Sequence, residues 1–599
     1  MGYNDTVEDI YRGGYSSLDP NSGDLYGGYR TDIKTIGSST DARTANIIKQ
    51  VSDQLSPGTK VVELSLIQPD VFEAIPKQHL EEVKRISKLT GVDVTVHGPL
   101  IDASGATQQA FDDQQREIAE KKILHAVERS HEINPEGNIP VTFHTANALP
   151  GARYSKKDGV EQKEFMPVVN QETGRIEQIK REEKYYPDRD LSKPEEYSVE
   201  EQLNTVNNTE WQNSIREIAA RNEDAERIMR EIAPLRPLFM NVHERVQSGE
   251  IRIEDLPPSQ REAIETYEKR AFNAGQQLSD SEAHMTALFS KAYKHGSRQE
   301  KEYLKGVSEF FKRQIPEKRD MSFEEKANAI QGVTQALGNI KPKIFKPAEE
   351  YAIEKSNETF GNVAWKAYKK FGSKAPIISL ENPPAGMGLS RGKDVKEMVE
   401  GAREQFVNNA VKEGKLSKDQ AEREAEKLIG VTWDVGHINQ LRQFGFSGKD
   451  IIKEAEEVKP LVKHMHLSDN FGMENTELPM GMGNVDLKEV MKTLGEKGEK
   501  SKKIVEAFHW WQHHSDQGKT SPVGPTFEAV GSPLYSTGFE APYWNQVAGL
   551  QPGYFSGYGQ TFPQINYETF GAGFSNLPPE LGGQSPGGQG GRMSGRGME

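Results

Sequence analysis

The sequence predicts an α/β fold, a (β/α)8 TIM barrel with a large helical insertion after the fourth strand and a low-complexity C-terminal tail. The first observation is that short apolar runs alternate with helical stretches, with four runs before residue 150 and four after residue 370. Such alternation is typical of a parallel sheet. The second observation is that six of the runs end at a His, Asp or Glu. Barrel strands end in this way where they supply a site at the C-terminal mouth.

The first half of the barrel is expected in residues 31–150. Gly91 is expected to cap the second helix of this half. The strand segments are RTDIKTIGSST (30–40), KVVELSLI (60–67), VDVTVHGPL (92–100) and IPVTFHTAN (139–147). The helical segments between them are ARTANIIKQVSDQL (42–55), PKQHLEEVKRISKLTG (76–91) and FDDQQREIAEKKILHAVERSHEI (111–133).

The alternation stops at residue 151 and resumes near residue 371. A charged hairpin turning at 172–174 is expected here, and no clear buried strand. Long charged stretches follow, in which Leu, Ile, Met and Phe recur at three- and four-residue intervals. Residues 151–370 are therefore predicted to be a mainly helical insertion. Because both of its ends are attached at the mouth of the barrel, we expect it to overhang the site and to restrict it to small or single-stranded substrates.

The second half of the barrel is expected in residues 371–515, with strands 5–8. These strands should lie in PIISL (376–380), IGVTWDV (429–435), VKHMHLS (462–468) and KKIVEAF (502–508). Residues 1–30 are predicted to be a flexible Gly/Tyr-rich leader. Residues 516–599 form a Gly/Pro/aromatic-rich tail, expected to be disordered at its end. The insertion and the aromatic tail are candidate surfaces for protein contacts.

Composition limits the class of protein. The formal net charge is −15, which counts against a surface made for duplex nucleic acid. The chain has no cysteine, so a metal must be held by nitrogen and oxygen. We find no secretory signal and no apolar run of the ~20 residues that span a bilayer. These features predict a cytoplasmic protein without a membrane partner.

The residues at the strand ends are those that bind divalent metals. Acids at the ends of apolar strands are costly to bury without a cation. His, Asp and Glu together suit Zn²⁺, with Mn²⁺ or Fe²⁺ as alternatives. The predicted ligands are His97, His144, Glu381, Asp434, His437, His466 and Glu506.

Two kinds of chemistry fit such a centre. A carboxylate can bridge two cations, so Glu381 suits a site in which a metal-activated hydroxide attacks a phosphodiester. A single cation would instead polarise a sugar carbonyl while two carboxylates move a proton. The predicted catalytic residues are Glu381 and Glu506. The candidate partner is therefore either a phosphodiester or nucleic acid, or a small sugar.

The motifs VHGPL, FHTAN, LENPPAGMG, WDVGH, HMHLSDN and VEAF resemble the xylose-isomerase-like TIM-barrel superfamily, and most closely its AP endonuclease family 2, the endonuclease IV type. The resemblance covers about residues 31–150 and 371–512. It implies that His97 and His144 are the histidines of the third and fourth strands and that Glu381 bridges two metals. It further implies that Asp434 and His437, the Asp-x-x-His pair, bind metal. The same role is implied for His466, the histidine of His-Leu-x-Asp, and for Glu506, the last-strand glutamate.

The chain departs from the endonuclease IV pattern at the third metal. The stretch after the seventh strand, NFGMENTELPMGMGNVDL, contains no histidine and offers only Glu474, Glu477 and Asp486. This departure leaves open a sugar isomerase or epimerase with one divalent metal, as in other members of the superfamily. A non-catalytic scaffold that keeps the barrel is a third possibility.

Three further polar residues are expected not to bind metal. Glu63 is predicted to make an internal ion pair, and His464 to lie deeper in the barrel than His466. Asp469 is predicted to orient a neighbour.

Overall fold

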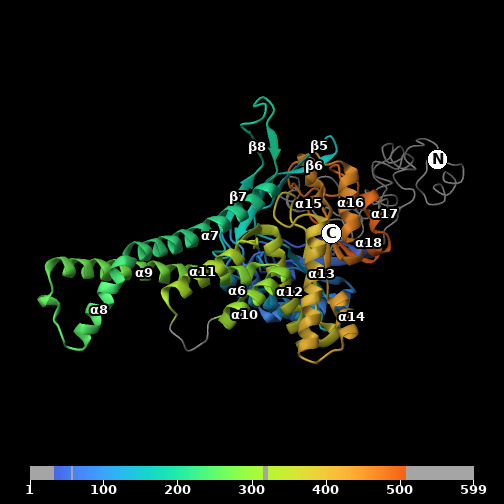
Figure 1. The fold of residues 1–599 in the computed structure, drawn as a ribbon. Helices are drawn as coiled ribbons and strands as arrows, with labels where there is room; N and C mark the ends of the chain where they lie inside the picture. The colour runs from blue at the N-terminus through green and yellow to red at the C-terminus, as the bar shows by residue number, and fades with distance from the viewer. Residues whose placement is uncertain (1–32, 56–58, 315–320, 508–525, 527–599) are drawn as a thin grey trace, which may run out of the picture. The chain divides into compact units, whose positions relative to one another are not determined.

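The computed structural model describes residues 33–55, 59–314, 321–507 and 526 (Figure 1). The predicted leader 1–30 lies outside these residues, as does the tail 516–599 apart from Thr526. The described residues form two compact units. The first comprises the described residues up to Pro167 and from Ala348 on, and the second comprises those between Val168 and Pro347.

The first unit contains a closed barrel of eight parallel strands, as predicted. The strand order is β1-β14-β13-β12-β11-β4-β3-β2. Most residues of these strands are buried, and each strand contributes at least one buried Val, Ile or Leu. The strands are β1 (Ile36–Ser39), β2 (Val61–Ser65), β3 (Asp93–His97), β4 (Pro140–His144), β11 (Ile377–Glu381), β12 (Ile429–Asp434), β13 (Val462–Leu467) and β14 (Lys502–Val505).

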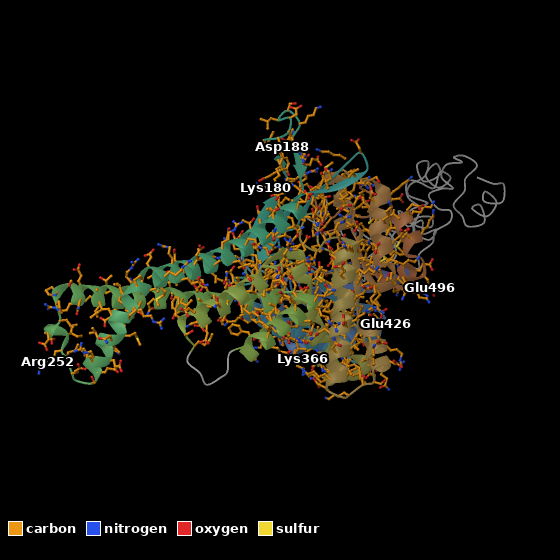
Figure 2. The ribbon with its side chains drawn as sticks, in the orientation of Figure 1. Lys180, Asp188, Arg252, Lys366, Glu426 and Glu496 are labelled. Atoms are coloured by element: carbon orange, nitrogen blue, oxygen red, sulfur yellow. The ribbon has the colours of Figure 1, made fainter. Side chains whose placement is uncertain are left out.

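Helices connect the strands, and their outer faces carry exposed charged side chains such as Glu426 and Glu496 (Figure 2). Gly91 ends its helix in the left-handed conformation at φ 67°, which confirms the predicted cap. The helices of this unit are α3 (Ile47–Leu55), α4 (Pro69–Ala74), α5 (Lys77–Thr90), α6 (Asp113–Ile133), α12 (Ala348–Phe371), α13 (Gly392–Lys412), α14 (Lys418–Leu428), α15 (Val435–Asn439), α16 (Gly448–Val458), α17 (Leu487–Leu494) and α18 (Glu496–Lys500).

The second unit has its own apolar core. Trp211 is buried among aliphatic side chains of several helices, and its indole N–H donates to the carbonyl of Leu337 at 3.0 Å. The long helices confirm the helical character predicted for the insertion. They are α7 (Val199–Ile232), α8 (Arg236–Gln247), α9 (Pro258–His295), α10 (Arg298–Gln314) and α11 (Phe323–Leu337).

Six short strands precede or follow these helices. The hairpin of β6 with β7 turns through Gly174, whose N–H donates to the carbonyl of Asn170 at 2.8 Å, as predicted. The expectation of no buried strand was wrong, because Val168 and Val169 of β6 are buried. Their apolar run is short and contains Pro167, so its periodicity is weak. The strands are β5 (Arg153–Lys157), β6 (Val160–Asn170), β7 (Ile176–Lys180), β8 (Glu182–Lys184), β9 (Glu195–Tyr197) and β10 (Phe345–Pro347).

The second unit is shorter than the predicted insertion 151–370. β5 and α12 group with the barrel. In α12, the hydroxyl of Thr359 donates to the carbonyl of Ala103 at 2.8 Å, and Lys355 pairs with Asp113 at 2.6 Å. These contacts attach α12 to the barrel unit. The expectation that the insertion overhangs the mouth stays a prediction.

Candidate metal centre

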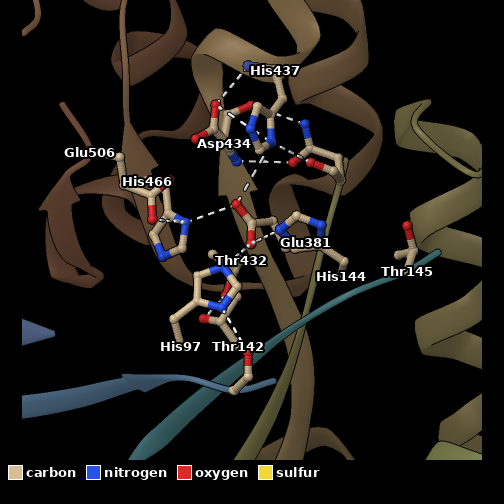
Figure 3. A network of polar contacts seen from close by, with 12 residues as sticks. His97, Thr142, His144, Thr145, Glu381, Thr432, Asp434, His437, His466 and Glu506 are labelled. Carbon is tan, nitrogen blue, oxygen red and sulfur yellow. Dashed lines mark hydrogen bonds and ion pairs between the residues drawn. The ribbon is translucent and has the colours of Figure 1, made fainter. Parts of the chain in front are cut away.

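Six of the seven predicted ligands come together at one end of the barrel (Figure 3). Parallel strands bring their carboxyl ends to the same mouth, so residues far apart in sequence become neighbours. His97, His144, Glu381 and Asp434 are the last residues of β3, β4, β11 and β12. His466 is next to last in β13, and Glu506 directly follows β14.

Glu381 is the centre of the group. Its carboxylate is fully buried, and one oxygen, Oε2, lies 3.2 Å from Nε2 of His97 and 3.3 Å from Nε2 of His144. The other oxygen, Oε1, lies 2.8 Å from Nδ1 of His466. Oε2 has no hydrogen-bond partner in regular geometry. Such a buried and unsatisfied carboxylate oxygen is costly unless a cation binds it.

His466 extends the group toward β14. Its Nδ1 lies 3.3 Å from Oε1 of Glu506. The side chain of Glu506 is 16% exposed, whereas those of Glu381 and His466 are fully buried. Glu506 is therefore the ligand candidate of this pair that solvent or a substrate can reach.

Asp434 is held in place by its neighbours. Its side chain accepts from the N–H of His437 at 2.7 Å and from the hydroxyl of Ser468 at 3.1 Å. Asn382 makes two hydrogen bonds with the backbone of Asp434, at 2.9 and 3.0 Å. The sequence interpretation assigned no role to Asn382 or Ser468. Their only signal in the sequence is that each directly follows a barrel strand.

His437 points its Nδ1 at the carbonyl oxygen of Asn382, at 2.8 Å. The same nitrogen lies 3.8 Å from Glu381 and 4.0 Å from Asp434. Among the described residues, His437 belongs to none of the groups that can hold a cation. Its role as a metal ligand stays a prediction, and a contact to substrate through Nε2 is the alternative.

Four groups of His, Asp and Glu in the described ranges could hold a cation, and two of them share Glu381. Within each group, one nitrogen or oxygen per residue lies within 4.8 Å of all the others. These donors fit a divalent cation, because nitrogen and carboxylate oxygen are the ligands that Zn²⁺ and Mn²⁺ prefer. The first group is Glu381, Asp434, His466 and Glu506, and the second is His97, His144 and Glu381.

Burial and neighbouring charges shift the pKa values of residues in the site, among them Glu506, His97 and His466. Burial raises the pKa of Glu506 to about 8, with nearby Glu381 and Asp434 acting in the same direction. Burial alone would lower the pKa of His97, but bonding to Glu381 outweighs it and raises this pKa to about 9. Burial likewise opposes the charged form of His466, yet Glu381 and Glu506 raise its pKa well above the ordinary value. Each of these three shifts favours the protonated form of its group near neutral pH.

These protons predict that metal affinity rises with pH. A cation must displace them from His97, His466 and Glu506, because only the deprotonated groups bind it. From about pH 6 to pH 8 we expect the affinity for Co²⁺ to rise about tenfold per pH unit for each proton released. Calorimetric titration in buffers of different ionisation enthalpy counts the protons. An affinity that stays constant across this range would contradict the prediction.

The supporting residues behave largely as predicted. Glu63 makes its internal ion pair with His466, whose Nε2 lies 3.0 Å from Oε1. His464 is fully buried and lies 2.9 Å from the other oxygen of Glu63 through Nε2. Asp469 orients backbone rather than a ligand, since it accepts from the N–H groups of Gly481 at 2.9 Å and Val485 at 3.0 Å. It therefore shapes the loop after β13.

The acidic candidates for a third metal do not gather. Asp486 caps α17 by accepting from the N–H of Glu489 at 3.1 Å, and Glu477 accepts from the side chain of Asn475 at 3.0 Å. Neither these two residues nor Glu474 belongs to a metal-binding group within the described part of the chain.

Residues 412–520 match the family described as xylose isomerase-like TIM barrel. This segment carries Asp434, His437, His466 and Glu506. Together with the closed barrel, the match identifies a xylose isomerase-like TIM barrel domain, the superfamily that the strand-end motifs resemble. A comparison with curated proteins found no match.

The fold is also similar to three solved structures. A D-tagatose 3-epimerase-like protein is 10% identical, with a TM-score of 0.34 over 79% of this chain and 90% of that one. The 3-keto-D-glucoside 4-epimerase YcjR from E. coli is 10% identical, with a TM-score of 0.34 over 83% and 98%. D-psicose 3-epimerase from Clostridium cellulolyticum H10 is 9% identical, with a TM-score of 0.33 over 87% and 96%.

Proposed function

We propose that this protein is a divalent-metal-dependent isomerase or epimerase of a small sugar. The observation that carries the proposal is the first donor group, in which two glutamates, one aspartate and one histidine converge, with Glu506 partly open to solvent. A divalent cation bound by this group would polarise a carbonyl oxygen of the substrate.

Two carboxylates are available to move the proton. Glu381 ends β11 and Glu506 directly follows β14, and these strands are separated by two others around the barrel. They therefore approach the centre from different sides. One carboxylate would take a proton from the carbon beside the carbonyl, and the other would return a proton to the second face or to the neighbouring carbon. The atoms balance without a further reactant.

The second candidate is a phosphodiester hydrolase of the endonuclease IV type. The observation in its favour is the second donor group, in which His97 and His144 share Glu381 with the first group. Two cations bridged by Glu381 would supply a hydroxide and stabilise the leaving oxygen. The scattered acids after β13 and the net charge of −15 weigh against this candidate.

Three measurements distinguish the two functions: the metal content, the exchange of substrate hydrogen for deuterium, and the cleavage of a phosphodiester. The purified protein would be analysed for bound metal and incubated with a panel of ketoses in D₂O, and separately with an abasic-site duplex and a chromogenic phosphodiester. One ion per chain with deuterium entering a ketose is the expected result. Two ions with phosphodiester cleavage and no exchange would replace it with the second candidate. If the protein binds metal tightly but catalyses neither reaction, a non-catalytic scaffold would be favoured.

A further inference from the structure

Glu63 is a buried carboxylate on β2, outside the six residues that converge at the mouth. In the described part of the chain it contacts one hydroxyl and two imidazoles. Its Oε2 accepts from the hydroxyl of Thr95 at 2.9 Å and lies 2.9 Å from Nε2 of His464. Its Oε1 lies 3.0 Å from Nε2 of His466. Glu63 therefore links a core histidine to a predicted metal ligand.

The ring of His466 is surrounded by three carboxylates. Nδ1 faces the donor group, 2.8 Å from Glu381 and 3.3 Å from Glu506. Nε2 faces Oε1 of Glu63 at 3.0 Å, and neither of these two buried atoms makes a hydrogen bond of regular geometry. The two nitrogens of this ring thus have separate partners, one at the metal centre and one beneath it.

His464 defines the other side of Glu63. Its Nε2 contacts Oε2 of Glu63, while its Nδ1 is buried without a hydrogen-bond partner. Because a carboxylate oxygen accepts, Nε2 of His464 donates to Glu63. Together with Thr95 it fixes one carboxylate oxygen, so the other oxygen is directed at His466.

We propose that Glu63 is a positioning residue that makes His466 bind metal through Nδ1, with the proton of the ring held on Nε2. A carboxylate behind a histidine ligand sets the tautomer, orients the ring and raises its basicity. His464 and Thr95 hold this carboxylate in turn. The inference rests on the metal centre of the proposed function, but it does not depend on the reaction.

The test is Glu63→Gln, which keeps the size of the side chain and removes its charge. We expect the Kd for Co²⁺ to rise about 10- to 100-fold, as for other groups behind a ligand. The visible spectrum of bound Co²⁺ should also change, because the bond to His466 weakens. Thr95→Val is the matched control, since it removes one hydrogen bond to Glu63 and leaves the charge. It should change the Kd less than about threefold. Wild-type affinity and spectrum in a folded Glu63→Gln protein would overturn the proposal.

A second measurement uses the wild-type protein and does not depend on the folding of the variant. The protein would be labelled with ¹⁵N in its histidine rings, loaded with ¹¹³Cd²⁺ and studied by NMR. Scalar coupling between the cadmium and a ring nitrogen identifies the ligating nitrogen of His466. The signals of His466 are assigned by their loss in the variant His466→Gln. Coupling through Nδ1 is expected, and coupling through Nε2 would overturn the proposal. A wild-type protein that binds metal without acting on sugars would refute the proposed function alone. One that binds no metal would refute both.

Discussion

Glu381→Gln is expected to remove at least one bound cation per chain. Glu381 is the residue common to both donor groups, and its two oxygens face three imidazoles. The amide keeps the volume but loses one acceptor and the charge. Changes behind a ligand cost about 10- to 100-fold in metal affinity, so loss of this direct ligand should cost at least about 100-fold. Elemental analysis after dialysis and titration with Co²⁺ measure the effect.

Glu474→Gln is the matched control for this substitution. It is the same chemical change at an exposed acid of the loop after β13, outside the metal-binding groups. Metal content should stay at the wild-type value in this variant. Full metal content in a folded Glu381→Gln protein would show that Glu381 is not a ligand. The metal would then have to be assigned to other residues of the site.

Glu506→Gln is expected to abolish proton transfer while retaining part of the metal affinity. Glu506 is the member of the first donor group with an accessible side chain, 16% exposed. A carboxylate in this position can reach a substrate, whereas the amide cannot accept its proton. Loss of a general base typically costs about 100- to 10,000-fold in rate. The measurement is the rate at which a ketose substrate exchanges hydrogen for deuterium in D₂O.

Glu506→Asp provides the comparison, because it keeps the carboxylate and draws it back by one methylene. It should recover part of the exchange rate, with little further effect on metal binding. Glu506→Gln protein that binds Co²⁺ and exchanges hydrogen at the wild-type rate would remove Glu506 from the reaction. Proton transfer would then have to be assigned to another group at the mouth.

At the mouth of the barrel, Asn382 positions other residues and is not itself a proposed metal ligand. Its side chain bonds to the backbone of Asp434 and its carbonyl accepts from His437. Asn382 thus sets the start of α15, where Asp434 also caps the helix by accepting from the N–H of His437. The support that orients Asp434 therefore comes from the end of the neighbouring strand, β11.

The barrel was readable from the sequence because each strand is an apolar run with a marked end. In a parallel strand buried on both faces, every position prefers Val, Ile or Leu, so a polar residue such as Glu381 or Asp434 stands out. Strand ends of one direction share one mouth, so the convergence of six residues followed from the fold class. His97 and His144 became site candidates by the same reasoning.

Contacts across the barrel were decided by the tertiary structure alone. Glu63 and His466 are separated by about four hundred positions, and nothing in either local pattern says that one faces the other. The direction of the His437 ring depends on the carbonyl of Asn382, which belongs to another strand end. Pairing of this kind depends on barrel closure and side-chain rotamers, which local sequence patterns do not contain.

For the insertion too, the sequence determined one part of the result and the tertiary structure the other. Residue periodicity determined that a long segment of helices interrupts the barrel after His144. That α12 belongs to the barrel unit was decided by contacts such as that of Thr359 with Ala103. The physical reason is that an amphipathic helix has the same apolar spacing whichever core it covers. Sequence therefore determined the kinds of elements and the donors of the site, and packing determined the partner of each.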